Sequence, residues 1–269
     1  MWSRIIARTA RAIGLELKHS QNRYFELLSQ QITDGARWLD LGCGRQFVPD
    51  WCASRERQAE IARRASILAG VDLDAALAEH PLLQLRAFAV GAHLPFRDES
   101  FEIVTANMVF EHVEDPLAIL IEIRRVLVPG GQLIFHTPNR RCPYIRVASL
   151  LSEPLKHKII WWLERRSERD IFPTYYRVNT PEEIKELGIR AGLNPISVCI
   201  GGSVGVFGSY GPLGVAEVFF LRALAMPALN PYNATVLAVL QKPPVTPVIP
   251  PSVASKSAQF PRLTSRLVS

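Results

Sequence analysis

The sequence predicts an α/β fold with a mostly parallel sheet that is covered by helices on both faces. The first observation is that short apolar runs, typical of buried strands, alternate with helical patterns along the middle of the chain. The second is that 48% of the 269 residues are hydrophobic and 21% are charged, a composition that supplies a large buried core. Parallel strands of this kind need both faces covered by helices.

The elements are expected in a regular order along the chain. Residues 1–33 carry apolar side chains at helical spacing and end at Asp34-Gly35, which predicts an N-terminal helical cap over residues 1–34. Thr180 and Pro181 form an N-cap and first helical position, which predicts a late helix running to Gly192. Strands are expected at residues 36–41, 67–73, 85–90, 101–105, 132–137, 196–200 and 234–240, with further helices at 55–64 and 116–127.

Two segments interrupt the alternation and are predicted as insertions in one domain of residues 1–242. Residues 138–180 hold nine basic and four acidic residues and are expected to form a basic lid. Residues 201–233 are rich in glycine and are expected to form a second insertion. Residues 243–269 carry six prolines with Ser, Thr and Val, which predicts a disordered tail.

Charge and cysteine usage narrow the class of protein. The net charge of +6 is concentrated in the lid and the tail. The four cysteines form no CxxC pair, so neither a disulfide framework nor a bound metal is expected, and a reducing, cytoplasmic location is predicted. No run reaches the roughly 18–20 uncharged apolar residues that cross a bilayer.

The most informative motif is residues 38–44, WLDLGCG, at the end of the first expected strand. Gly42 and Gly44 let a ligand approach the backbone closely. Phe47 stands where a dinucleotide-binding turn has its third glycine, and no basic residue anchors a phosphate as in a P-loop. Asp40 repels phosphate but suits ammonium or sulfonium charge, both of which S-adenosylmethionine carries. A purely structural strand–turn–helix corner is the alternative interpretation.

A second acidic motif follows the next strand. Residues 70–74 read GVDLD, and an acid at this strand end can accept the hydroxyl hydrogens of a ribose. Asp72 is the residue we expect in that role, ahead of its neighbour Asp74. A surface acid without a ligand is the alternative.

Together these segments resemble the class I S-adenosylmethionine-dependent methyltransferases of the small-molecule, methyltransferase type 11-like branch. Three more segments match that family in the same order: residues 93–102 (HLPFRDESFE), 110–116 (FEHVEDP) and 127–133 (LVPGGQL). The resemblance covers residues 34–240. It implies a Rossmann-like, doubly wound sheet of seven strands, mostly parallel with an antiparallel last strand, with helical additions at the N-terminus and the lid.

The resemblance also implies the residues that hold S-adenosyl-L-methionine. Family members usually carry an Asp before the LPF motif that contacts adenine, and this chain has Val90 there. Backbone groups of Gly91 and Ala92 are therefore expected at the adenine edge. The full set of expected cofactor-binding residues is Asp40, Gly42, Cys43, Gly44, Asp72, Leu73, Gly91, Ala92 and Asn107.

The expected function is methylation of a small-molecule acceptor, at the hydroxyl oxygen of a saccharide, lipid-linked or secondary-metabolite substrate. A hydroxyl acceptor needs a general base, and His112 is the first candidate, followed by Glu111 and His136. No NPPY-like segment follows the fourth strand, which disfavours amino-group methylation of nucleobases. Val90 supports an alternative, a non-catalytic binding or scaffold protein of the same fold. A nicotinamide-dependent oxidoreductase is disfavoured by the missing third glycine.

The lid suggests which partners the protein has. Residues 156–166 place Trp161 and Trp162 between cations, a pattern typical of interfacial helices, and residues 213–229 offer a second apolar surface, so peripheral membrane contact is one interpretation. A phosphorylated acceptor and a lid that simply packs on the domain are the others. No RNA-binding module is recognisable, so a nucleic-acid partner is not expected. The oligomeric state has no signal in the sequence.

Overall fold

The apolar runs form one seven-stranded sheet in the computed structural model, which describes residues 2–15, 19–89, 92–149, 173–202, 207 and 210–245. The strand order is β3-β2-β1-β4-β5-β7-β6. Six strands are parallel, and β7 is antiparallel to both of its neighbours, as predicted. The strands are β1 (Arg37–Leu41), β2 (Ile67–Asp72), β3 (Leu85–Phe88), β4 (Phe101–Asn107), β5 (Leu127–Pro138), β6 (Asn194–Gly201) and β7 (Thr235–Gln241).

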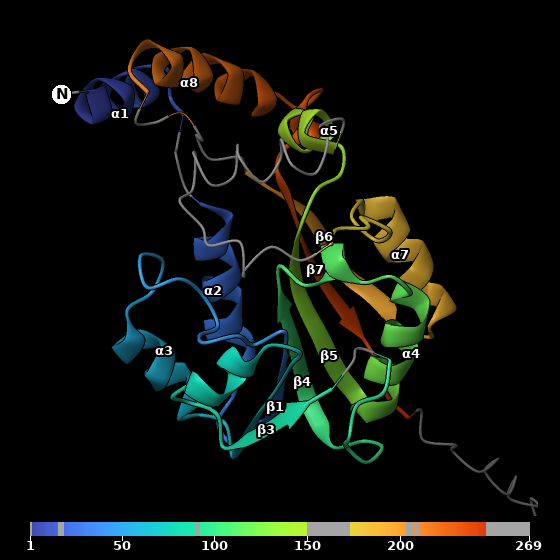
Figure 1. Ribbon diagram of the computed structural model, residues 1–269. Helices are drawn as coiled ribbons and strands as arrows, with labels where there is room; N and C mark the ends of the chain where they lie inside the picture. The colour runs from blue at the N-terminus through green and yellow to red at the C-terminus, as the bar shows by residue number, and fades with distance from the viewer. Residues whose placement is uncertain are drawn as a thin grey trace, which may run out of the picture.

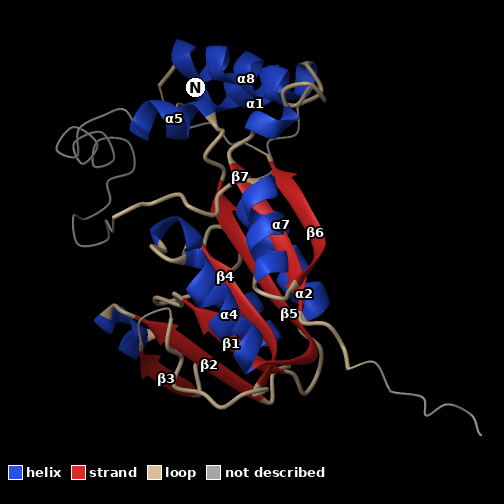
Figure 2. Cartoon of the chain, turned by 90° about the vertical axis from the view of Figure 1, so that its right-hand side faces the viewer, coloured by secondary structure: helices blue, strands red, loops and turns tan. Residues whose placement is uncertain are grey.

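Helices cover both faces of the sheet, and a third group lies beyond one end of it (Figures 1 and 2). One face carries α2 (Ser20–Gln31) and α3 (Arg55–Ala62), and the other carries α4 (Pro116–Val126) and α7 (Pro181–Arg190). The distal helices are α1 (Trp2–Ala12), α5 (Pro143–Ser149) and α8 (Pro212–Leu224). Short 3₁₀ turns are η1 (Ala75–Glu79), η2 (Phe110–His112) and η4 (Asn230–Tyr232).

Alternating side chains divide the core into two layers. In β1, Trp38 packs in the cluster on the α2 face, whereas Leu39 and Leu41 pack in the cluster on the α4 face. This alternation follows from the two-residue period of a strand. Strand residues two apart therefore share a face, and this rule decides where the polar residues at the strand ends point.

The N-terminal helix differs from its prediction as one continuous element over residues 1–33. Gly14 has a φ of +66°, and the N–H of Leu15 donates to the carbonyl of Ala10 at 2.8 Å, which is a helix-ending Schellman arrangement. A new helix, α2, starts at Ser20, where the ring of His19 accepts a hydrogen bond from the N–H of Gln21. The helical spacing of apolar residues did not reveal this break, because a glycine stops a helix without changing that spacing.

Several sequence predictions lie outside the described residues. These are the adenine-edge positions Val90 and Gly91, the tryptophan pair of residues 156–166, and residues 246–269 of the tail. Within the described ranges, no helix has the length and apolar character required to cross a bilayer.

Candidate active site

The glycine turn, residues 42–44, is held by hydrogen bonds to the end of β2 at the carboxyl edge of the sheet. The N–H of Gly42 donates to the carbonyl of Val71 at 2.8 Å, and the N–H of Gly44 donates to Oδ2 of Asp72 at 2.8 Å. Gly42 is exposed, has a φ of +61°, and leaves no room for a side chain, since an added Cβ would overlap with Val109. The turn therefore presents bare backbone, which fits a ligand that lies directly against it.

Cys43, between the two glycines, points away from this edge. Its thiol is buried in the core on the α2 face, close enough to β2 that a Cβ added to Gly70 would lie 2.7 Å from the sulfur. Burial raises the pKa of the Cys43 thiol far above its ordinary value. The side chain packs the turn, and only its backbone faces the ligand edge.

Asp72 stands where the sequence predicts a ribose contact. Its Oδ2 accepts from Gly44, and its Oδ1 accepts from the N–H of Asp74 at 2.8 Å. Each carboxylate oxygen keeps a second lone pair for another donor. Asp74 instead accepts from the N–H of Ala76 at 2.9 Å and so begins η1. The exposed Leu73 lies between these two acids.

Asp40 is buried beneath the turn. Thr105 donates its hydroxyl hydrogen to Oδ1 of Asp40, and Trp38 in turn donates its indole N–H to the Thr105 hydroxyl at 2.7 Å. Burial raises the pKa of Asp40 to about 7, and the negative charge of Asp72 adds to that rise. A buried carboxylate of this kind favours a nearby cation, because the positive charge offsets its desolvation.

A second polar group lies on the same face of the sheet, under α2. The amide nitrogen of Asn107 donates to Gln21 Oε1 and to the Phe47 carbonyl, both at 2.9 Å, and its oxygen lies 3.0 Å from Nδ1 of His136. Because the Asn107 oxygen can only accept, Nδ1 of His136 carries the proton. The His136 ring stacks on Tyr24 with the ring centres 5.7 Å apart. Asn107 therefore ties α2 to β4, β5 and the glycine turn.

His136 is not brought together with the other two candidate bases. It is fully buried, and burial lowers its pKa to about 3. The next residue of β5, Thr137, points to the opposite face and contacts Glu111. The strand period therefore separates His136 from the predicted acceptor side.

Glu111 and His112 form a pair after β4. Oε2 of Glu111 accepts from the Thr137 hydroxyl at 3.2 Å, and Thr137 accepts from the amide of Asn179 at 2.6 Å. Nδ1 of His112 donates to the carbonyl of Pro173 at 2.8 Å, and its Nε2 lies 3.9 Å from Glu111 Oε1. The His112 side chain is 32% exposed and that of Glu111 is 6% exposed. The pair thus combines a buried carboxylate with an accessible imidazole.

The end of the predicted lid docks on this pair. The backbone N–H groups of Tyr175 and Tyr176 donate to the carbonyl of Glu111 at 2.7 and 3.2 Å. Arg177 donates to the carbonyl of Glu114 at 2.7 Å. Burial raises the pKa of the Tyr176 hydroxyl. Residues 173–180 therefore form a wall over η2 at the carboxyl edge of β4 and β5.

Asn107 was predicted as a cofactor-binding residue, whereas Thr105, Gln21 and Tyr24 are absent from the sequence prediction. Thr105 is detectable in principle, because it lies directly opposite Asp40 in the sheet. Gln21 and Tyr24 carry no such signal, since their place depends on where α2 packs.

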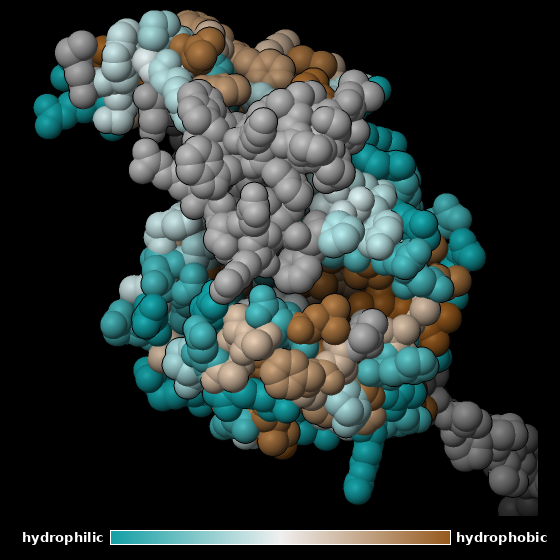
Figure 3. Space-filling model, in the orientation of Figure 1, coloured by the Kyte–Doolittle hydropathy of each residue, from teal (hydrophilic) through white to brown (hydrophobic). Residues whose placement is uncertain are grey.

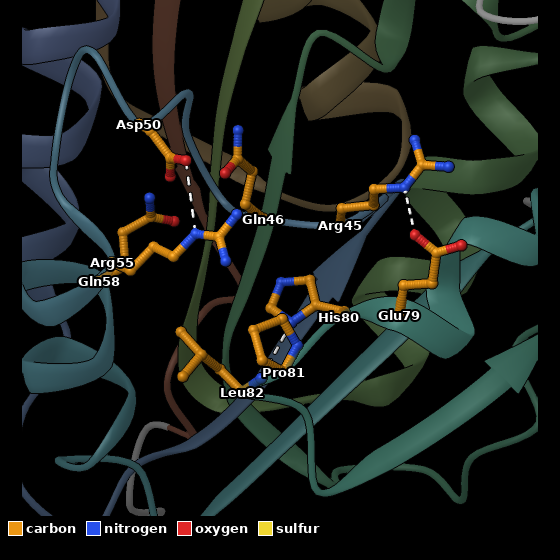
Figure 4. Close-up of a pocket in the computed structure, with 9 residues that line it drawn as sticks. All are labelled: Arg45, Gln46, Asp50, Arg55, Gln58, Glu79, His80, Pro81 and Leu82. Carbon is orange, nitrogen blue, oxygen red and sulfur yellow. Dashed lines mark hydrogen bonds and ion pairs between the residues drawn. The ribbon is translucent and has the colours of Figure 1, made fainter.

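A cavity of about 420 Å³ lies beside the glycine turn but does not include it (Figure 4). Arg45 pairs with Glu79 at 2.7 Å on one side, and Arg55 with Asp50 at 3.4 Å on the other. The ring of His80 lies between these pairs. Among the described residues, none of those expected to bind the cofactor lines the cavity, which is formed by residues that follow the glycine turn and by the segment after η1.

This fold and this edge define a class I S-adenosylmethionine-dependent methyltransferase, since the bare glycine turn and the acids at the carboxyl ends of β1 and β2 fit that cofactor. The comparison with protein families agrees. The model of a methyltransferase domain family matches residues 15–198, and the chain belongs to that family.

Curated relatives carry a more specific name. The chain is 30% identical over 173 residues to a ubiquinone biosynthesis O-methyltransferase of Cereibacter sphaeroides, covering 61% of this chain and 62% of that protein. It is 28% identical over 181 residues to the protein of the same name from Dinoroseobacter shibae, covering 64% and 65%. The chain thus spans less than two thirds of these relatives.

Solved structures share the fold at low identity. An S-adenosylmethionine-dependent methyltransferase of Methanosarcina mazei has a TM-score of 0.52 at 16% identity, covering 81% of this chain and 97% of that one. The 4+2 cyclase SpnF has a TM-score of 0.50 at 17% identity, covering 83% and 81%. Because a cyclase shares the architecture, the fold alone does not determine the reaction.

Proposed function

We propose that the protein transfers a methyl group from S-adenosylmethionine to a hydroxyl oxygen of a small-molecule acceptor. The observation that carries this proposal is the accessible His112 beside the buried Glu111, at the same edge as the glycine turn. The relatives named for ubiquinone biosynthesis support an O-methyl product. Of the acceptors predicted from the sequence, they favour the lipid-linked one, because ubiquinone is itself a lipid.

The glycine turn and two acids would hold the cofactor. The backbone of Gly42 and Gly44 would lie against it, Asp72 would accept from the ribose hydroxyls, and Asp40 would face the methionine ammonium group. When bound, S-adenosylmethionine supplies an electrophilic methyl group on a sulfonium, so the protein needs to contribute positioning, exclusion of water and a base.

His112 would supply the base. Its Nδ1–H donates to the Pro173 carbonyl, and its Nε2 would be the atom that accepts the hydroxyl proton of the acceptor. The Glu111 carboxylate, 3.9 Å from Nε2, would then stabilise the imidazolium that forms. The hydrogen bond from Thr137, whose hydroxyl in turn accepts from Asn179, holds the Glu111 side chain in place for that role.

The test is turnover against a panel of hydroxylated quinols, catechols and sugars with S-adenosylmethionine. We expect His112→Gln to lower kcat by roughly a hundredfold or more while cofactor affinity, measured by calorimetry, is unchanged. Equal kcat in the variant would contradict the assignment of the base. Cofactor binding without turnover on any acceptor would favour the non-catalytic alternative.

We also propose a cytoplasmic location for the enzyme. All four cysteines are free thiols, and Cys199 is exposed. Exposed free thiols are typical of a reducing compartment.

A further inference from the structure

The distal helices form a unit of their own. Helix α8 packs on α1 through a small cluster of Ile6, Ala10 and Val218, separate from the two core layers of the sheet. Figures 1 and 2 show α1 and α8 side by side beyond the end of the sheet. Tyr144 of α5 joins them, since its ring lies 5.5 Å from Phe220 and its hydroxyl donates to Glu217.

The outer side of α8 is apolar and exposed. Residues at three- and four-residue spacing share one side of a helix, and Val218, Leu221 and Leu224 are buried on such a side, with Val218 in the cluster that contacts α1. Away from this buried side, Leu213 is 61% exposed and Phe219 is 55% exposed. Figure 3 shows hydrophobic side chains gathered over α8. We call Leu213, Phe219, Phe220 and Met226 the docking face; all four are exposed.

The charge around this face is positive. Arg4, Arg8 and Arg11 are exposed on α1, and Arg222 is exposed on α8. Within α1 and α8, which are described in full, Glu217 is the single acid. It is buried, and it accepts from Tyr144 and from the N–H of Phe207. The exposed charge of the two helices is therefore purely cationic.

We propose that the docking face binds the surface of an anionic lipid bilayer. Apolar side chains that enter the interface, flanked by arginines that reach phosphate groups, are the combination that holds an interfacial helix. A second copy of the chain fits less well, because a twofold contact through this face would bring the arginines of both α1 helices together.

The position of the unit matches this role. Helix α5 follows the carboxyl end of β5, and α8 precedes β7, which starts at the same edge because it is antiparallel. The docking face therefore belongs to the end of the molecule that carries the glycine turn and His112. Docking would present that end to the membrane, although the binding itself does not depend on the methyl-transfer proposal.

Vesicle co-sedimentation of the full chain tests the proposal. The probes are vesicles of phosphatidylcholine alone and vesicles with about 30% phosphatidylglycerol, at low salt and at about 0.5 M salt. We expect binding to the anionic vesicles and loss of most of it at high salt. Phe219→Ser should weaken binding by roughly fivefold, and Arg4→Glu with Arg8→Glu by roughly tenfold.

The matched control is Ile189→Ser, which removes an apolar side chain that is 65% exposed on α7, away from the docking face. It should bind like the parent. Circular dichroism and a thermal melt establish that each variant is folded. The proposal is overturned by absence of binding to anionic vesicles, by equal binding of Phe219→Ser, or by a dimer in light scattering that Phe219→Ser dissociates.

Discussion

The glycine turn and the distal helices differ in whether their apolar side chains are buried or exposed. Around the turn, apolar side chains such as Cys43 and Val109 pack inward, and bare backbone is left at the edge. In the distal helices, Phe219 and Leu213 are left outside although they belong to an apolar helix. The first arrangement suits a small polar ligand held by backbone and carboxylates. The second suits a large apolar partner, and the predictions below test this contrast.

The largest effect is expected from Gly42→Ala. The residue has a φ of +61°, and its added Cβ would overlap with Val109, so backbone strain and a steric clash act together. We expect affinity for S-adenosylhomocysteine to fall roughly a hundredfold in calorimetry. Gly35→Ala is the control, because its φ is +84° but no atom lies within 4 Å of the added Cβ. Gly35→Ala should lower the stability of the protein without changing its affinity for S-adenosylhomocysteine. Equal affinities in both variants would refute the proposal that the glycine turn lies against the cofactor.

The next largest effect is expected from Asp40→Asn, and it depends on pH. Its pKa rises from 3.8 to about 7 on folding, so the folded state binds more protons than the unfolded chain between these values. The stability that Asp40 contributes is therefore present below about pH 4 and is lost as the pH rises through 7. Asp40→Asn should be more stable than the parent at pH 8, by on the order of 4 kcal/mol at most, and by little at acidic pH.

Denaturant unfolding of the Asp40 variant at several pH values measures this difference. Asp34→Asn, at an exposed position, is the control for the loss of a single carboxyl group. If the free energy of unfolding changed with pH in the same way in the parent and in Asp40→Asn, the raised pKa of Asp40 would be contradicted. The same variant should bind the cofactor more weakly at pH 8, since it lacks the charge that faces the ammonium group.

A smaller loss of affinity is expected from Asp72→Asn. The variant loses one of the two oxygens that accept from Gly44 and Asp74, together with the charge that strengthens a ribose contact. Cofactor affinity should fall roughly tenfold with little change in melting temperature. Asp74→Asn is a matched control, since asparagine also caps η1, and it should bind like the parent. Equal losses in both would mean that the ribose role is not specific to Asp72.

The smallest effect concerns the packing of the distal helices. Val104→Ala opens space in the main core and should cost about 2–3 kcal/mol of unfolding free energy. Val218→Ala affects the small cluster between α1 and α8 and should cost about 1 kcal/mol, with faster hydrogen exchange confined to those helices. Comparable losses, or exchange that spreads to the sheet, would show that the distal unit and the sheet unfold together.

Short-range sequence patterns were the basis for predicting the sheet and the edge at which the cofactor is expected. A continuous apolar run such as residues 67–71 predicts a buried strand, and the glycine pair at positions 42 and 44 predicts a tight turn, so the strands and the turn could be located without a structure. The N-terminal helix was predicted wrongly at Gly14, where one residue of positive φ ends α1. His136 and His112, both predicted as candidate bases, do not lie together. Thr137 contacts Glu111, the neighbour of His112, whereas His136 points to the opposite face of β5 and stacks on Tyr24.

The sequence by itself determined the α/β class and the order of the seven strands along the chain, and it predicted a ligand edge at Asp40, Gly42 and Asp72, because each depends on residues close together in the chain. Only the tertiary structure decided that Gln21 reaches Asn107, that Asn179 supports Glu111 through Thr137, and that α8 leaves Phe219 exposed. These contacts join residues far apart in sequence. Their existence depends on how helices and strand faces pack, which no local pattern records.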